Sequence, residues 1–180
     1  HWRLLLDALV KEGSVAQSGA FVHLPEHGSQ LAARDETLLQ RLTPHLMEAG
    51  AQGAWVRDLA EQLGEPAANL RPAMARLARS GHLYQVVKDL YLDAATAARL
   101  AALVRQLALA DTEAAKATDA QQTSNPLPIL TVAKFRDASG LGRKRAVQML
   151  EFFDRIGLCR RVGDTHVLRL ESEVFKGSLE

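Results

Sequence analysis

Hydrophobic positions recur at helical spacing in separate stretches of the chain, and each stretch is followed by a glycine and two short apolar runs. Residues 66–92 show this pattern. Pro66 suits the first position of a helix, and Gly81 follows that helix where a left-handed cap is needed. The helix carries Leu70, Met74 and Leu77, and the two apolar runs are Leu83–Val87 and Leu90–Leu92, joined at Lys88-Asp89. The pattern predicts a helix followed by a β-hairpin.

The same pattern returns 76 residues later and also opens the chain. The later copy consists of a helical stripe (Ala146, Leu150, Phe153), a cap at Gly157, and the runs Leu158–Val162 and Thr165–Arg169 on either side of Gly163-Asp164. The first copy consists of Leu5, Leu6, Leu9 and Val10, then Gly13, then Val15 and Phe21-Val22 around Ser18-Gly19. Three such copies predict an array of small modules rather than one large core.

The helices that precede each hairpin identify the module. In the middle copy, a helix at Asp35–Glu48 with a kink at Pro44 and a short helix at Trp55–Leu63 come before the helix at Pro66. The last copy has the order Ala94–Leu109, Val132–Asp137, a turn at Ser139–Gly142, and Arg143–Ile156. Three helices followed by a two-stranded wing make a winged helix. We therefore predict a mostly α-helical fold with small β-hairpins, arranged as an elongated array of tandem winged-helix modules.

The predicted boundaries are a truncated winged helix at 1–30, a complete one at 31–93 and another at 94–172. The first copy contains only its third helix and wing, and the chain begins at His1 without an initiator methionine. We expect it to be part of a longer protein. Residues 111–126 are small and polar, which predicts a flexible insertion inside the last module. Their high alanine content leaves a continuation of the preceding helix as the alternative.

Charge is distributed unevenly along the chain. The whole sequence has 22 basic and 21 acidic residues, yet residues 127–170 hold nine Lys or Arg against four acids. A basic module attached to a faintly acidic region favours a polyanionic partner. A merely solvated charged surface is the alternative.

The sequence shows no catalytic or metal-binding constellation, so we predict no enzyme activity, no cofactor and no metal site in this chain. The string from His23 to His27 matches a zinc-protease pattern, but Pro25 and Gly28 break the helix that the pattern requires. Cys159 would need a histidine partner to act as a nucleophile, and His166 lies on the facing strand of the predicted wing. A small residue packed under the wing explains this cysteine better than a nucleophile does. No apolar run is long enough to span a membrane.

Three cations, Arg143, Lys144 and Arg145, occupy the first turn of the last module's third helix. They oppose the helix dipole, which costs stability, and such local violations of design rules often mark function. Lys144 shares the exposed face with Gln148. Further candidates for the same surface are Arg136 on the second helix and one of Arg160 and Arg161, which alternate along the wing. Phe152 lies off the core stripe, either as a packing contact to the neighbouring module or as a stacking platform for a base.

The stretch 131–169 resembles the last winged-helix module of the bacterial selenocysteine-specific elongation factors, the SelB family. The matching strings are Phe135-Arg136-Asp137, Gly140-Leu141-Gly142-Arg143-Lys144, Leu150-Glu151-Phe152-Phe153-Asp154-Arg155, Gly157, and Arg161 with Gly163-Asp164. The preceding modules also resemble the tandem winged helices of that family's C-terminal extension. The insertion at 111–126 departs from the short connection associated with the family.

The resemblance implies that this region binds a stem-loop in messenger RNA beside a UGA codon. Arg143, Lys144 and Arg145 would hold the RNA backbone, Arg136 and Arg161 would flank it, and a loop base would approach at Gly142. Arg160 and Gln148 are further candidate RNA-binding residues. It also implies a monomeric cytoplasmic protein without membrane contact. The family's N-terminal half binds GTP and Mg²⁺ and carries selenocysteinyl-tRNA to the ribosome.

Two other functions fit tandem winged helices: a DNA-binding transcriptional regulator and a protein-interaction array. Cations crowded at a helix tip favour RNA, because the narrow major groove of A-form RNA does not admit the length of a helix. A major-groove DNA reader usually carries donors further along the helix. The middle module, with Arg71, Arg76 and Arg79 on its third helix, is either a spacer or a second contact.

Overall fold

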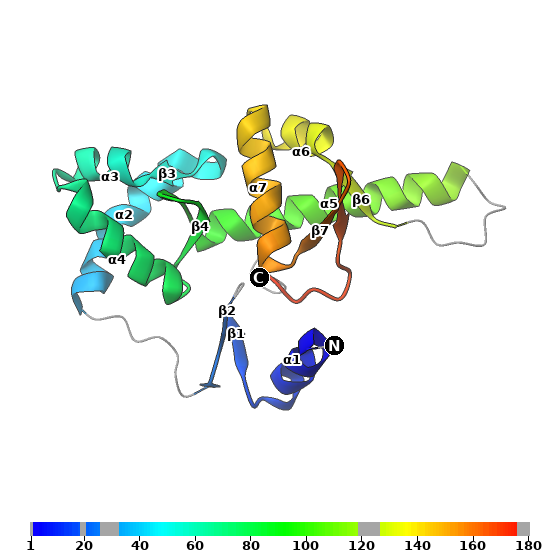
Figure 1. Ribbon diagram of the computed structural model, residues 1–180, viewed down its shortest axis with the longest axis horizontal. Helices are drawn as coiled ribbons and strands as arrows, with labels where there is room; N and C mark the ends of the chain where they lie inside the picture. The colour runs from blue at the N-terminus through cyan, green and yellow to red at the C-terminus, as the bar shows by residue number, and fades with distance from the viewer. Residues whose placement is uncertain (1, 19–20, 26–32, 119–126, 176–180) are drawn as a thin grey trace. The chain divides into compact units, whose positions relative to one another are not determined.

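The computed structural model describes residues 2–18, 21–25, 33–118 and 127–175 (Figure 1). The chain divides into two compact units, one ending at Ala97 and including Phe175, the other running from Ala98 to Val174. Both units combine helices with small antiparallel sheets, as the sequence predicts. Among the described helices, none has the length and apolar character needed to cross a membrane.

The first unit opens with the predicted helix and hairpin. Helix α1 spans Trp2–Glu12, and strands β1 (Ala16–Ser18) and β2 (Phe21–His23) pair antiparallel. Gly13 ends the helix with a φ of +79°. His23, the first residue of the zinc-protease-like string, therefore ends a strand rather than lying on a helix. Glu26 and His27 lie outside the described residues.

A winged helix follows in the same unit. Its elements are α2 (Ala33–Ala49), a 3-10 turn (Gly50–Gln52), β3 (Ala54–Trp55), α3 (Val56–Leu63), α4 (Ala67–Arg79), β4 (Leu83–Val87) and β5 (Leu90–Asp93). Pro66 is the residue before α4 rather than its first residue. The core joins all three helices to the wing through the fully buried Leu42, Val56, Met74, Leu77 and Leu83.

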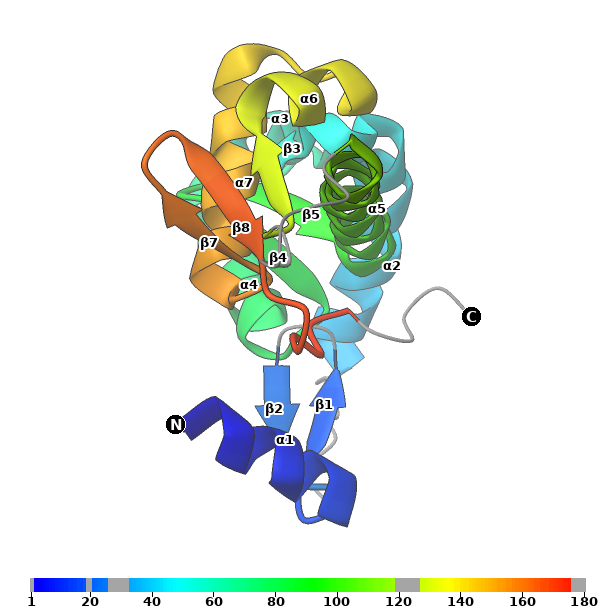
Figure 2. The ribbon, with the colours of Figure 1, turned by 90° about the vertical axis from the view of Figure 1, so that its right-hand side faces the viewer.

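The second unit repeats this order. It contains most of α5 (Ala94–Thr118), then β6 (Ile129–Thr131), α6 (Val132–Ser139), α7 (Arg143–Ile156), β7 (Cys159–Val162) and β8 (Thr165–Leu168). In both modules the wing is a three-stranded sheet rather than the predicted hairpin, because a short strand before the second helix pairs with the last strand. Figure 2 shows β8 between β6 and β7, with the sheet beside α7.

Helix α5 is longer than predicted. It continues to Thr118, so residues 111–118 are helical and the prediction of an insertion without regular structure is wrong for this half. The alanine-rich sequence explains the continuation, since alanine has the highest helix propensity. Residues 119–126 lie outside the described part of the chain.

The apolar stripe of α7 forms the core of the second unit. Ala146, Leu150 and Phe153 are fully buried, as predicted, and Met149 joins them. Phe152 is also buried, with only 2% of its surface exposed and its ring centroid 5.2 Å from that of Phe153. A buried ring offers no face to a base, so Phe152 is a packing residue and not a stacking platform.

Candidate nucleic-acid interface

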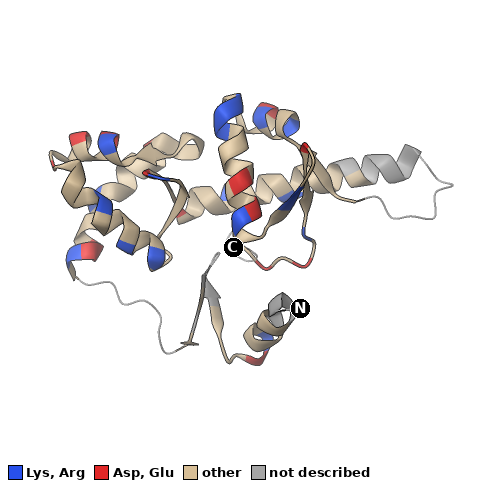
Figure 3. Cartoon of the chain, viewed as in Figure 1, with Lys and Arg blue, Asp and Glu red and all other residues tan. Residues whose placement is uncertain are grey.

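The first turn of α7 concentrates positive charge. The helix begins at Arg143 after Gly142, whose backbone is extended at φ −66° and ψ 154°, and no acidic residue lies in the first turn. The unpaired N–H groups of a first turn and the positive end of the helix dipole both attract anions. Figure 3 shows this turn in blue beside α6. The tip of α7 therefore adds side-chain charge to a helix end that already favours an anion.

The three cations of the tip differ in their surroundings. Arg143 and Lys144 are exposed, and within the described residues neither forms an ion pair with a carboxylate. Arg145 is half-buried, donates a hydrogen bond from Nη1 to Gln148 Oε1 at 3.1 Å, and has its pKa lowered by burial. The structure thus leaves two tip cations available and places the third, with Gln148, in a contact along the helix.

A cleft of about 410 Å³ lies next to the tip. Arg143 and Val147 of α7 form one side of it, and the wing supplies Arg161 and Asp164. Thr131 at the end of β6 and Val132 and Ala133 at the start of α6 also line it, and His166 completes the lining. Two cations from different elements therefore border one depression on the surface.

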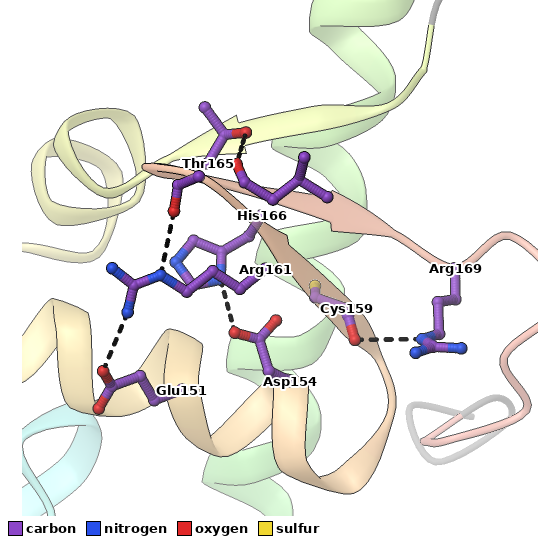
Figure 4. Close-up of polar contacts among 9 residues, drawn as sticks. Glu151, Asp154, Cys159, Arg161, Thr165, His166 and Arg169 are labelled. Carbon is purple, nitrogen blue, oxygen red and sulfur yellow. Dashed lines mark hydrogen bonds and ion pairs between the residues drawn. The ribbon is translucent and has the colours of Figure 1, made fainter.

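The wing arginines point to different faces. Arg161 Nε donates to the carbonyl of Gly163 at 3.1 Å, and its Nη1 lies 3.5 Å from Glu151 Oε1 on α7 (Figure 4). Arg160 is exposed, and strand alternation directs it to the opposite face. One of the two shares a face with α7, as the alternation predicts. The structure does not bring Arg160 to the cleft.

Arg136 lies on α6 and forms an ion pair with its neighbour Asp137, with 2.6 Å between Nη2 and Oδ1. Its side chain is 43% exposed and that of Asp137 is 65% exposed. Exposed pairs of this kind are worth little, about 0–1 kcal/mol, so a phosphate can replace the carboxylate at small cost. Gly142 is open as well, because a Cβ built there would meet no atom within 4 Å.

The module that carries this surface, and the chain as a whole, are similar to known elongation factors. A model of the family "Elongation factor SelB, winged helix" matches residues 125–168. The selenocysteine-specific elongation factor of Haemophilus influenzae is 31% identical over 170 residues, which make up 94% of this chain and 25% of that protein. Its counterpart from Escherichia coli is 31% identical over 166 residues, 92% of this chain and 24% of that protein.

A solved structure matches most of this chain and is itself almost completely covered by it. It is the mRNA-binding domain of elongation factor SelB from E. coli in complex with SECIS RNA, with a TM-score of 0.58 and 32% sequence identity. The match includes 77% of this chain and 99% of that domain. The chain belongs to the SelB family. It spans about a quarter of the length of its full-length SelB relatives.

The sequence did not predict the contact between His166 and Asp154 in this SelB module. His166 lies two residues after the turn residue Asp164, yet it is 3% exposed, and its Nδ1 lies 2.8 Å from Asp154 Oδ2. Cys159 is fully buried nearby, and burial, with the carboxylate of Asp154, raises the pKa of its thiol to about 12. A thiol with this pKa stays protonated at neutral pH, so Cys159 packs under the wing, as predicted. Asp154 is four residues after the core residue Leu150 and therefore lies on the same side of α7, which was a signal for a buried polar pair.

Proposed function

We propose that this chain binds a stem-loop in messenger RNA, the selenocysteine insertion element, through the tip of α7 and the cleft beside it. The observation that carries the proposal is the exposure of Arg143 and Lys144 at a helix N-terminus, without carboxylate partners among the described residues. The mRNA-binding domain of the E. coli relative is itself in complex with SECIS RNA, which supports the same class of ligand here.

The placement of charge along α7 favours RNA over duplex DNA. Cations occupy the first turn, whereas Glu151 lies exposed two turns further along the helix. A helix inserted lengthwise into a DNA major groove would bring this carboxylate toward phosphates and base edges. The major groove of A-form RNA is too narrow for such insertion, but a helix tip can meet a loop or bulge. The SelB module therefore fits a folded RNA end better than a long groove.

The proposed contacts differ in kind. Arg143 and Lys144 bind backbone phosphates directly, and an extruded loop base approaches the open surface at Gly142. Arg161 and Arg136 flank these contacts by exchanging their carboxylate partners for phosphate. The remaining predicted residues, Arg145, Gln148 and Arg160, contribute at longer range: the first two support the helix tip, and Arg160 adds to the general positive field.

For the whole protein we propose the role that its family name describes. The RNA-bound region would help to deliver selenocysteinyl-tRNA to a UGA codon on the ribosome, in the cytoplasm and as a monomer. GTP and Mg²⁺ would be bound by the family's N-terminal domains. The present chain would contribute binding and no catalysis.

The test is a binding measurement with the full chain. Hairpins taken from beside in-frame UGA codons are compared with duplex DNA of equal length by fluorescence anisotropy. We expect preference for the hairpin, and a slope of log affinity against log salt near −3 to −5 if about five phosphates are neutralised. Preference for duplex DNA would support a DNA-binding regulator instead, and binding to neither would support a protein-interaction array.

The variant Arg143→Ala with Lys144→Ala tests the site itself. We expect loss of hairpin binding with an unchanged circular dichroism spectrum. Arg57→Ala with Lys88→Ala, two exposed cations of the middle module, is the charge-matched control. Equal losses in both double variants would show that only net charge matters, and full retention in the α7 variant would refute the site.

A further inference from the structure

Two carboxylates on α7 each hold one strand of the wing. Glu151 and Asp154 are three residues apart, a spacing that places both on one side of a helix. Glu151 contacts Arg161 of β7, and Asp154 contacts His166 of β8 (Figure 4). The two contacts differ in burial. The side chains of Arg161 and Glu151 are 56% and 49% exposed, whereas those of His166 and Asp154 are 4% and 18% exposed.

The buried contact lies at the centre of the sheet. His166 is on the middle strand, opposite Leu130 of β6 and opposite Arg161 of β7. Its Nδ1 lies 2.8 Å from Asp154 Oδ2, while Asp154 Oδ1 is buried without a hydrogen-bond partner among the described atoms. Asp154 thus depends on His166 for its polar contact. Removing one partner of such a buried pair leaves the other uncompensated, which is more costly than breaking a surface pair.

The strand register connects this buried contact to the cleft. Because Arg161 pairs directly with His166, any displacement of β8 relative to α7 also moves the backbone from which Arg161 projects. Arg161 and Arg143 both line the cleft, one from the wing and the other from the helix tip. Their separation therefore depends on how the wing is attached to α7. The exposed Arg161–Glu151 contact, at 3.5 Å, is too weak to set that attachment alone.

We propose that His166 is a positioning residue for RNA binding. Through Asp154 it fixes the central wing strand on α7 and so places Arg161 at the cleft together with Arg143. This inference rests on the proposed RNA-binding function of the site. His166 itself is buried and does not need to touch the RNA.

The experiment combines substitution of His166 with substitution of Arg161 in the full chain. In His166→Leu we expect hairpin affinity to fall about 5- to 20-fold while the far-ultraviolet circular dichroism spectrum is retained. Adding Arg161→Ala to that variant should cost much less than Arg161→Ala costs in the wild type, because interacting residues give non-additive effects. His166→Asn, whose amide nitrogen lies near the place of Nδ1, should restore affinity to within about threefold of wild type.

The controls separate positioning from folding and from the function itself. His82→Leu removes a half-buried histidine of the middle module, which contacts Ser80, and should leave hairpin affinity unchanged. If His166→Leu does not fold, Asp154→Asn takes its place and must show the same non-additivity with Arg161→Ala. Wild-type affinity in a folded His166 or Asp154 variant, or full additivity, would overturn the positioning role. Wild-type affinity in Arg143→Ala with Lys144→Ala would instead overturn the RNA-binding site.

Discussion

The two winged helices of this chain use their arginines in different ways. In the middle module two of the three arginines of α4 are paired within the fold, Arg71 with Asp89 and Arg76 with Asp35, and the third, Arg79, is exposed at the C-terminal end of the helix. In the last module Arg143 and Lys144 stand at the tip of α7 without carboxylate partners among the described residues. The backbone fold is the same, so what separates a candidate binding surface from a structural module is where charge is left unpaired.

The first turns of the two third helices show the same contrast. Helix α4 begins with Ala67, Ala68 and Asn69, which carry no charge, whereas α7 begins with Arg143, Lys144 and Arg145. Cations at a helix N-terminus oppose the helix dipole and cost stability. The first turn of α7 is therefore destabilised by its cations, and the first turn of α4 is not. A phosphate bound at the tip of α7 would be attracted both by these cations and by the helix dipole.

The largest expected effect separates binding from stability. Arg143→Ala with Lys144→Ala should weaken hairpin binding by about 100-fold or more, because each charged hydrogen bond contributes about 1.5–3 kcal/mol and 1.4 kcal/mol is tenfold. The same change should raise the free energy of unfolding by a few tenths of a kcal/mol per cation, since unfavourable dipole contacts are removed. Anisotropy and urea unfolding measure the two quantities.

Arg76→Ala in the middle module should have the opposite effect, a loss of stability with little change in hairpin affinity. It removes the paired partner of Asp35 and should lower the urea midpoint without a matching loss of hairpin affinity. If Arg76→Ala weakens RNA binding as much as the tip variant does, the contrast between the modules is false and the middle module is a second contact.

Much of this contrast could be predicted from the sequence. The bounds of α7 were predicted as Arg143–Ile156 and are found there, because Gly142 precedes and Gly157 follows an apolar stripe of helical period. The third strand of each wing was missed, since β3 has two residues and β6 has three, too few for a period to be recognised. Short strands of this kind form because the neighbouring strand is already in place.

The pairing of charges was harder to predict. Strand alternation left open which of Arg160 and Arg161 shares the face of α7, and it gave no sign of the contact between Arg161 and Glu151 or of the contact between His166 and Asp154. Both contacts join residues that are 10 to 12 positions apart and depend on the packing of the wing against the helix. Contacts between a helix and a wing are decided by tertiary packing rather than by the local sequence pattern.

Two glycines, one in each module, should differ in how much stability is lost when each is replaced by alanine. Gly53 has a φ of +69°, and a Cβ built there would lie 3.0 Å from the backbone oxygen of Tyr91. Gly53→Ala should therefore destabilise the middle module by about 2 kcal/mol, measured by urea unfolding. Gly142→Ala should cost less than about 1 kcal/mol, as its backbone suits any residue and alanine is only a weaker cap.

The order of the two variants should be reversed for hairpin affinity: the variant that loses less stability should lose more affinity. Gly142→Ala should lower affinity severalfold if a loop base approaches this surface, whereas Gly53→Ala should not affect binding by the folded fraction. An unchanged affinity in Gly142→Ala would limit Gly142 to its role at the start of the helix.

The pH dependence of stability tests the ion pair between Arg76 and Asp35 in the middle module. The hydrogen bond from Arg76 is the main cause that lowers the pKa of Asp35 below its ordinary value of 3.8. Because the folded pKa is depressed, this carboxylate contributes stability above about pH 4, and the contribution is lost as pH falls through the lowered pKa. Asp35→Asn should flatten the dependence of the unfolding free energy on pH below 4, measured by urea titration at several pH values. The same slope in wild type and variant would contradict the assignment.

The smallest expected effect concerns Glu151, the carboxylate that Arg161 contacts in the absence of RNA. An exposed pair of this kind is worth about 0.2–1 kcal/mol, so Glu151→Gln should raise hairpin affinity by no more than about fivefold. Glu12→Gln changes net charge equally, on an exposed residue of α1, and should have no such effect. The gain should disappear when Arg161→Ala is added, because no arginine then remains to be released. A gain that persists there would mean that Glu151 acts by direct repulsion of phosphate along α7, and the exchange of carboxylate for phosphate at Arg161 would have to be abandoned.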